Sequence, residues 1–138
     1  MSKHLMRSPT VAIGTSSLGH MDYSEVQPVL NRAMELGINS FDTAPLYGKA
    51  EIFLGKFTRS SGTKLLITTK YGLPRPIEYS PKNLRESVFK SLDALEGSGI
   101  ETLFLHSIPA SSITDELISE MRNLKNEGLI KNYGYSGD

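Results

Sequence analysis

The chain has 138 residues, with 15 basic and 15 acidic side chains and no cysteine. The length predicts one domain over residues 1–138, and the missing cysteines exclude disulfides and thiolate metal sites. The balanced charge argues against nucleic acid or an anionic membrane as a partner. With no apolar run of transmembrane length and no signal-peptide pattern at the start, we expect a cytoplasmic protein.

The first expected elements are a strand, a helix and a second strand. Apolar residues predict the strands over 11–15 and 38–42. Between them, Ser24 is expected to cap the helix and to form a capping box with Gln27. Gly37 stands where a glycine commonly ends a helix.

The rest of the chain continues this alternation of helix and strand. Ser80 and Pro81 have the order of an N-cap and a first helical residue, and Thr114 is expected to cap a later helix that Gly128 ends. The expected elements are a helix over 49–57, a strand over 65–70, a helix from 81, a strand over 102–106, a helix from 115 and a strand over 130–135.

The resulting order, β-α-β-α-β-α-β-α-β, predicts an α/β fold with a parallel sheet and right-handed connections. Two architectures fit this order: an open doubly wound sheet, or part of a (β/α)8 barrel. The dinucleotide fingerprint GxGxxG is absent, because the spacing over residues 14–19 does not match it. Periodicity alone leaves both architectures open.

Three successive expected strands end in residues that can do chemistry: Asp42, Lys70 and His106. The carboxyl ends of parallel strands lie at one edge, where barrel enzymes place their active sites. Tyr47 follows Asp42 on the adjoining loop and can reach the same space. Each residue alone has an ordinary explanation as a solvated strand end, a core histidine or a packed loop tyrosine. Their combination at one edge favours a site.

Together, these four side chains have the chemistry needed to donate a proton to a carbonyl group. Tyrosine is a weak acid, with an ordinary pKa near ~10, and a nearby ammonium favours its phenolate. A carboxylate fixes the ammonium, so the tyrosine becomes a usable general acid. A neutral histidine can orient the carbonyl oxygen and share its developing charge.

Several segments together resemble the aldo-keto reductase family. The most specific runs from Gly37 to Gly48 with Glu51 and Leu54-Gly55 after it. Further segments that resemble the family are 68–70, 80–92, 103–106 and 128–136. The resemblance covers nearly the whole chain and implies a (β/α)8 barrel.

The resemblance implies NADPH-dependent reduction of an aldehyde or ketone to an alcohol. In it, Tyr47 is the proton donor, Lys70 and Asp42 adjust its acidity, and His106 places the substrate. It also implies that Gly14, Thr15, Asp42 and Ser136 contact the nicotinamide end of the cofactor. The choice of NADPH over NADH and the identity of the carbonyl compound stay open.

A barrel of this kind typically needs ~250 residues, so 138 residues predict a partial barrel of about (βα)4 plus a fifth strand. We expect the isolated chain to bind NADPH weakly or not at all and to show little reductase activity. We also expect a homodimer, formed through the open sheet edges or through an exposed apolar inner face. Two other functions stay open: a non-catalytic half-barrel module, and a lyase of another barrel class in which Lys70 forms a Schiff base.

Overall fold

A computed structural model describes residues 11–137, which form five strands, four α-helices and two 3-10 helices. No helix among these residues is both long and apolar enough to cross a membrane. In chain order the elements are β1 (Ile13–Gly14), η2 (Leu18–His20), α1 (Tyr23–Glu35), β2 (Ser40–Asp42), α2 (Ala50–Ser61), β3 (Leu66–Tyr71), α3 (Pro81–Ala94), β4 (Thr102–His106), η3 (Ala110–Ser112), α4 (Asp115–Asn126) and β5 (Asn132–Ser136).

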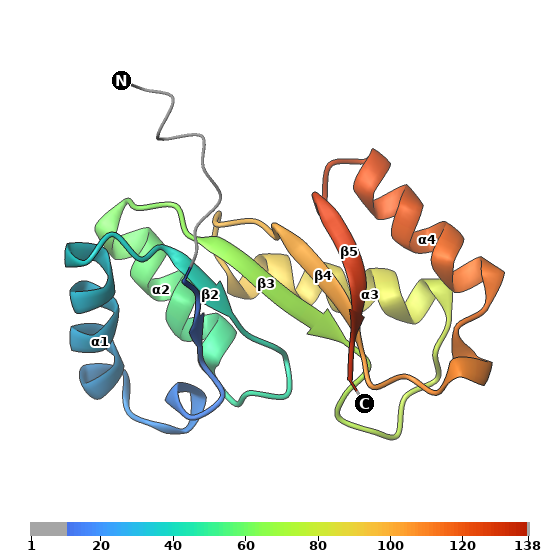
Figure 1. Cartoon of the computed structure of the whole chain (residues 1–138), viewed down its shortest axis with the longest axis horizontal. Helices are drawn as coiled ribbons and strands as arrows, with labels where there is room; N and C mark the ends of the chain where they lie inside the picture. Colours follow the sequence, from blue (N-terminus) through green and yellow to red (C-terminus); the bar gives the residue numbers. More distant parts are fainter. Residues whose placement is uncertain (1–10, 138) are drawn as a thin grey trace.

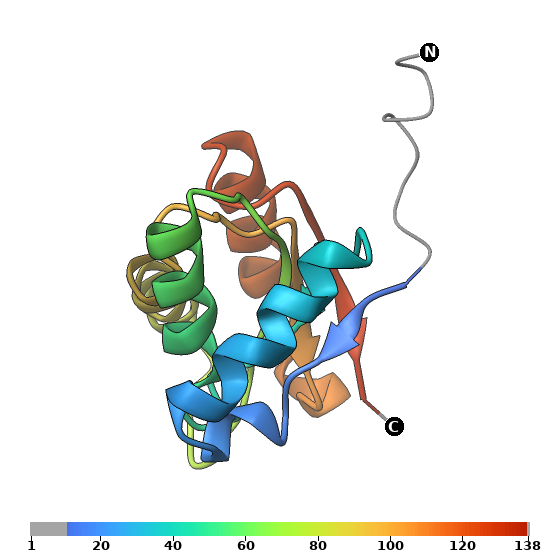
Figure 2. The ribbon, with the colours of Figure 1, turned by 90° about the vertical axis from the view of Figure 1, so that its left-hand side faces the viewer.

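The five strands form one parallel sheet in the order β1-β2-β3-β4-β5. The α-helices cover one face of this sheet, and the other face is open (Figures 1 and 2). Consecutive strands are neighbours throughout, as in a barrel, whereas a doubly wound sheet reverses direction at a switch point. The arrangement confirms the prediction of an α/β fold built as part of a (β/α)8 barrel.

The helix-facing side of the sheet forms the hydrophobic core. Registered residues of parallel neighbours point to the same side, and the rows Ile13–Phe41–Ile67 and Tyr71–Leu105 point toward the helices. Phe41 and Ile67 are completely buried, as are the helix residues that pack against them. Burial of a large apolar side chain contributes about 1.5–3 kcal/mol, so this layer is the main source of stability.

The inner side of the sheet, which faces away from the helices, is mostly polar. Its strand residues are Gly14, Ser40, Asp42, Leu66, Thr68, Lys70, Thr102, Phe104, His106, Asn132, Gly134 and Ser136. Among them only Leu66 and Phe104 are large and apolar, so the expectation of an apolar inner face is wrong. The expectation came from the idea that a half barrel exposes a face that further strands would cover, and it did not consider that the apolar residues of β2, β3 and β4 alternate with polar ones that point to this side.

Helix α1 begins two residues earlier than predicted. Its N-cap is Asp22, and the Asp22 amide donates to Glu25 Oε1 over 3.2 Å. The predicted capping box of Ser24 and Gln27 is therefore wrong, because an equivalent pair with the same spacing lies two residues upstream. Gly37, with φ 76°, follows the end of this helix as predicted.

Most of the other predicted ends of elements agree with the structure to within a few residues. The Ser80 and Thr114 side chains accept from backbone amides and cap α3 and α4, as predicted. The helix expected over 49–57 continues to Ser61, because its last turn is polar and gave no apolar signal. The first strand is shorter than predicted, since only Ile13 and Gly14 pair with β2.

Candidate active site

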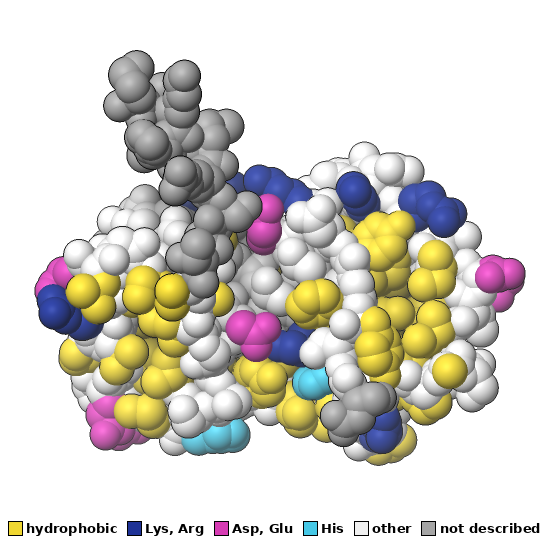
Figure 3. All heavy atoms as spheres, viewed as in Figure 1, with side chains coloured by type: hydrophobic (Ala, Val, Ile, Leu, Met, Phe, Trp, Pro, Cys, Tyr) yellow, Lys and Arg dark blue, Asp and Glu magenta, His cyan; other side chains and the backbone are white. Residues whose placement is uncertain are grey.

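The predicted site residues lie at one edge of the sheet. Asp42 ends β2, Lys70 is the residue before the last in β3, and His106 ends β4. In a parallel sheet these carboxyl ends share an edge, which is where barrel enzymes carry their chemistry. The open face shows an acidic, a basic and a histidine side chain close together near its centre (Figure 3).

Lys70 is at the centre of this group. Its Nζ donates to Asp42 Oδ2 over 2.9 Å and to the carbonyl oxygen of Thr43 over 2.8 Å. The lysine side chain is only 4% exposed, whereas that of Asp42 is 39% exposed. The ammonium is therefore desolvated and held by two acceptors that follow each other along the chain.

Tyr47 reaches the same space from the loop between β2 and α2. Its ring centroid is 4.9 Å from Lys70 Nζ and 6.5 Å from the His106 ring centroid, with the two rings nearly perpendicular at 83°. The four residues predicted from the strand ends and the adjoining loop thus come together. Lys70 is in direct contact with one of them and lies over the ring of another.

Two glycines allow the loop that carries Tyr47 to lie against η2. A Cβ at Gly19 would stand 1.6 Å from the Tyr47 carbonyl oxygen, so no other residue fits at this position. Gly48 has φ 58°, and the Lys49 amide donates to the Gly19 carbonyl over 2.9 Å. This close approach fixes the backbone on both sides of Tyr47.

His106 is in an environment that favours its neutral form. Burial lowers the pKa of His106 below its ordinary value of 6.5; the Lys70 ammonium lowers it further and the Asp42 carboxylate opposes the change. Burial is the largest of these causes of the lowered pKa. An imidazole that is neutral at neutral pH can donate a hydrogen bond from one nitrogen.

A buried carboxyl group lies behind this site, on the helix-facing side of β3. Thr69 Oγ1 donates to Glu51 Oε2 over 2.6 Å, and Glu51 is only 8% exposed. Burial raises the pKa of Glu51, while hydrogen bonds and the charge of Lys70 oppose this. From the sequence, Glu51 was recognised only as part of the segment that resembles the aldo-keto reductase family.

The sequence-based prediction of the site did not include the Thr43 carbonyl, which binds Lys70, or Gly19, which contacts the Tyr47 backbone. A backbone acceptor such as the Thr43 carbonyl leaves no trace in a sequence. The glycine at 19 could have been noticed, because it precedes the loop of Tyr47 in a segment that also contains Gly14. The need for a glycine there depends on a contact between segments 28 residues apart, which only the fold shows.

The residues expected to contact a nicotinamide cofactor lie beside the same group. Gly14 registers with Asp42, and a Cβ at Gly14 would meet nothing within 4 Å, so the inner face above it is open. Thr15 is buried, and its Oγ1 donates to the Asp42 carbonyl over 3.0 Å. Ser136 registers with His106 at the other side of the site. The open space at Gly14 fits a flat ring lying next to the four residues.

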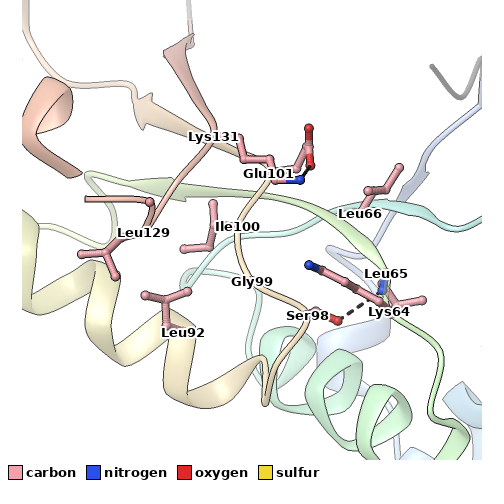
Figure 4. Close-up of a pocket in the computed structure, with 11 residues that line it drawn as sticks. Lys64, Leu65, Leu66, Leu92, Ser98, Gly99, Ile100, Glu101, Leu129 and Lys131 are labelled. Carbon is pink, nitrogen blue, oxygen red and sulfur yellow. Dashed lines mark hydrogen bonds and ion pairs between the residues drawn. The ribbon is translucent and has the colours of Figure 1, made fainter. Parts of the chain in front are cut away.

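A separate small pocket lies at the opposite edge, near the amino ends of β3, β4 and β5 (Figure 4). Its volume is about 160 Å³. Glu101 and Lys131 form an ion pair of 3.6 Å within it, and the Leu65 amide donates to Ser98 Oγ. These polar groups satisfy one another, and none of the four site residues lines this pocket.

Comparison with known proteins agrees with this geometry. Residues 10–138 match the model of the Aldo/keto reductase family. The chain is 31% identical over 121 residues to D-arabinose 1-dehydrogenase of Saccharomyces cerevisiae, covering 81% of this chain and 36% of that protein. It is 33% identical over 135 residues to the uncharacterized oxidoreductase YqkF of Bacillus subtilis, covering 91% and 44% respectively. The chain therefore belongs to the aldo/keto reductase family of oxidoreductases.

Solved structures lead to the same family. A putative aldo-keto reductase from Pseudomonas aeruginosa superposes with a TM-score of 0.81 at 35% identity, over 91% of this chain and 53% of that one. The holo form of aldo-keto reductase AKR11C1 from Bacillus halodurans gives a TM-score of 0.81 at 31% identity, over 91% and 45%. The chain thus spans between about a third and about half of the length of these relatives.

Proposed function

We propose that this chain supplies the catalytic residues for the NADPH-dependent reduction of an aldehyde or ketone to an alcohol. The observation that carries the proposal is the position of Tyr47 beside the buried Lys70 and its partner Asp42. When bound, the reduced nicotinamide supplies the hydride that the carbonyl carbon accepts. The residues of this chain then have to deliver a proton to the carbonyl oxygen.

Tyr47 is the proposed proton donor. As the hydride arrives, negative charge develops on the carbonyl oxygen, and the phenol O–H of Tyr47 transfers its proton there. The phenolate that remains is stabilised by the ammonium of Lys70, whose position Asp42 and the Thr43 carbonyl fix. Because this ammonium is almost completely buried, its attraction for a phenolate is stronger than in water.

His106 is the proposed group that places the substrate. Its lowered pKa keeps the ring neutral at neutral pH, so it can donate a hydrogen bond to the carbonyl oxygen without competing as an acid. Gly14, Thr15, Asp42 and Ser136 are the proposed neighbours of the nicotinamide end of the cofactor. NADPH rather than NADH is the proposed hydride donor on the strength of the family resemblance.

Two other functions stay possible, and one observation favours the reductase over the lyase. A Schiff base needs a lysine amine that is neutral and free to attack. Lys70 donates to two acceptors and is 4% exposed, which does not suit that role. Borohydride trapping of a carbonyl compound on Lys70 would support the lyase. Turnover that depends on Tyr47 would exclude both the lyase and a non-catalytic module.

We further propose that the 138-residue chain by itself binds NADPH weakly and reduces carbonyls slowly or not at all. Barrel enzymes bind phosphate with loops after the seventh and eighth strands, and residues 11–137 contain five. A catalytic group without a positioned hydride donor loses most of the proximity effect, which reaches about 7–11 kcal/mol. Calorimetry of this chain with NADPH tests the proposal, and micromolar affinity would contradict it.

A homodimer also stays a proposal, and the sheet edges are its best-supported surface. β1 and β5 each have one neighbour, which leaves one backbone edge free on each strand. The polar inner face supports association through edges rather than through that face. A ring closed by pairing β4 of one copy with β1 of the other is less favoured, since β5 pairs with β4 at five positions. Light scattering near 15.2 kDa would contradict any dimer.

A chimera tests the reductase proposal without relying on the isolated chain. Residues 11–137 would replace the matching segment of the Bacillus halodurans aldo-keto reductase, with which they superpose at a TM-score of 0.81. We expect the chimera to oxidise NADPH with benzaldehyde, and Lys70→Met to lower kcat at least about a hundredfold. A chimera that folds and binds NADPH by calorimetry but reduces nothing would contradict the proposal.

A further inference from the structure

A cavity of about 620 Å³ lies at the carboxyl ends of β3 and β4, where the loop that follows His106 begins. It lies between the loop after β3 and the loop after β4, and its walls are partly apolar and partly polar. Its lining residues are Leu73, Arg75, Ser107, Ile108, Pro109, Ala110, Ile113 and Tyr135. The volume is within the range of about 300–1,000 Å³ that small-molecule sites occupy.

Among residues 11–137, Arg75 is the only charged residue that lines this cavity. None of the ion pairs among residues 11–137 involves it. Its Nε donates to the Tyr79 hydroxyl over 3.3 Å, and one terminal nitrogen donates to the Ser107 carbonyl. Both acceptors are neutral, so the positive charge is not compensated by a described carboxylate.

Arg85, by contrast, is an arginine whose charge is compensated by carboxylates of the same protein. It donates to the carboxylates of Glu120 and Glu127 and ties α3 to α4. Arg75 holds two loops in place through neutral groups instead, and it keeps further N–H donors for another partner. Arg75 is exposed to solvent, and a guanidinium at the side of a partly apolar cavity can bind a carboxylate with two parallel hydrogen bonds.

The cavity is joined to the proposed site through Ser107, the residue directly after His106. Ser107 has φ 53°, a left-handed conformation that is unusual for a residue with a side chain. Its amide donates to the Ser136 carbonyl over 2.8 Å, and its own carbonyl accepts from Arg75. Such conformations cost energy and concentrate at ligand sites. Here the residue that directly follows the proposed substrate-placing histidine accepts a hydrogen bond from the Arg75 guanidinium.

We propose that this cavity binds the acyl or aryl part of a carbonyl substrate that also carries a carboxylate, with Arg75 as the residue that recognises the anion. The inference rests on the proposed reductase function and names the substrate class of the same site. The carboxylate lies against Arg75, the body of the substrate lies on the apolar wall formed by Leu73, Ile108 and Ile113, and the carbonyl points toward His106. Neutral aldehydes of the same shape fit the walls but leave the guanidinium without a partner.

Two product-like ligands of matched shape test this on the 138-residue chain without cofactor. Amide chemical shifts of the 15N-labelled chain would be followed during titration with 4-(hydroxymethyl)benzoate and with its neutral amide, 4-(hydroxymethyl)benzamide. We expect the carboxylate to bind about tenfold more tightly than the amide and to shift residues 107–113. Arg75→Gln should weaken the carboxylate about tenfold and leave the amide unchanged, with Arg75→Lys in between.

Arg122 provides the control, because it is an exposed arginine on α4 that does not line the cavity. Arg122→Gln should bind both ligands as the wild type does. Equal affinity for the two ligands, an equal loss of both in Arg75→Gln, or no binding of either would overturn the proposal. None of these results depends on hydride transfer, so they would not contradict the reductase function. In the same way, an inactive chimera would not contradict the anion selectivity of the cavity.

Discussion

The two sides of the same strands differ in composition and in role. On the helix-facing side of β3 and β4, Ile67, Leu103 and Leu105 are buried and contribute packing. On the inner side of the same strands, Lys70 and His106 are polar and lie in the proposed site. Because side chains alternate along a strand, a residue that packs in the core is followed directly by one that lies on the side of the proposed site. The inner face can hold charged groups because the helix-facing side stabilises the sheet without it.

Two tyrosines illustrate the difference. Tyr71 lies on the helix-facing side, where burial raises its pKa to about 12 and its hydroxyl donates to Asn83 over 2.7 Å. It is a fixed structural donor. Tyr47 lies on the open side, where its ring is close to the Lys70 ammonium and to the His106 ring.

The largest effect on stability is expected from the helix-facing side of β2. Phe41→Ala should lower the free energy of unfolding by about 3–5 kcal/mol, because it leaves a cavity in a fully buried position. Urea unfolding measures this. The preceding residue is the matched control: Ser40→Ala, on the inner side, should change the free energy by no more than about 0.5 kcal/mol. Equal losses would mean that the two faces are not separated as described.

A smaller effect of defined sign is expected at Glu51. Its folded pKa is raised above the ordinary 4.5, mainly by burial. The folded chain therefore binds more protons than the unfolded chain between these two values, and stability falls as the pH rises through them. Glu51→Gln keeps an acceptor for Thr69 and removes this loss, so the variant should be more stable than the wild type at neutral pH. Urea unfolding should show the difference vanish below 4.5, and a wild type that is more stable at neutral pH would contradict the assignment.

His106 should produce the opposite pH dependence. Its folded pKa is lowered from 6.5, so below that value the unfolded chain binds more protons and stability falls as the solution is acidified. Unfolding curves between about pH 8 and about pH 5 should show this loss in the wild type and less of it in His106→Gln. His20→Gln serves as the control and should behave as the wild type does. An identical loss in both variants would place the titrating group elsewhere.

Much of the fold could be predicted from local patterns, and the site could be predicted only in part. Ser80, Thr114 and Gly37 act as the sequence indicated, because caps and glycine stops are local interactions. The polarity of the inner face and the position of the first capping box were missed. The contact between Gly19 and the Tyr47 backbone also needed the fold, since it depends on how two distant loops approach each other. Strand ends were informative because parallel topology makes them neighbours.

The most direct test removes the phenol oxygen from two tyrosines, one on the loop beside the open face and one on the helix-facing side of β5. Single-turnover hydride transfer would be measured in the chimera for Tyr47→Phe and for Tyr133→Phe, which registers with Leu103 on the helix-facing side. We predict that Tyr47→Phe lowers the rate of hydride transfer by about 10²–10⁴, the usual contribution of a general acid. Tyr133→Phe should leave the rate unchanged. A rate for Tyr47→Phe within a factor of two of the wild type would contradict its role as the proton donor.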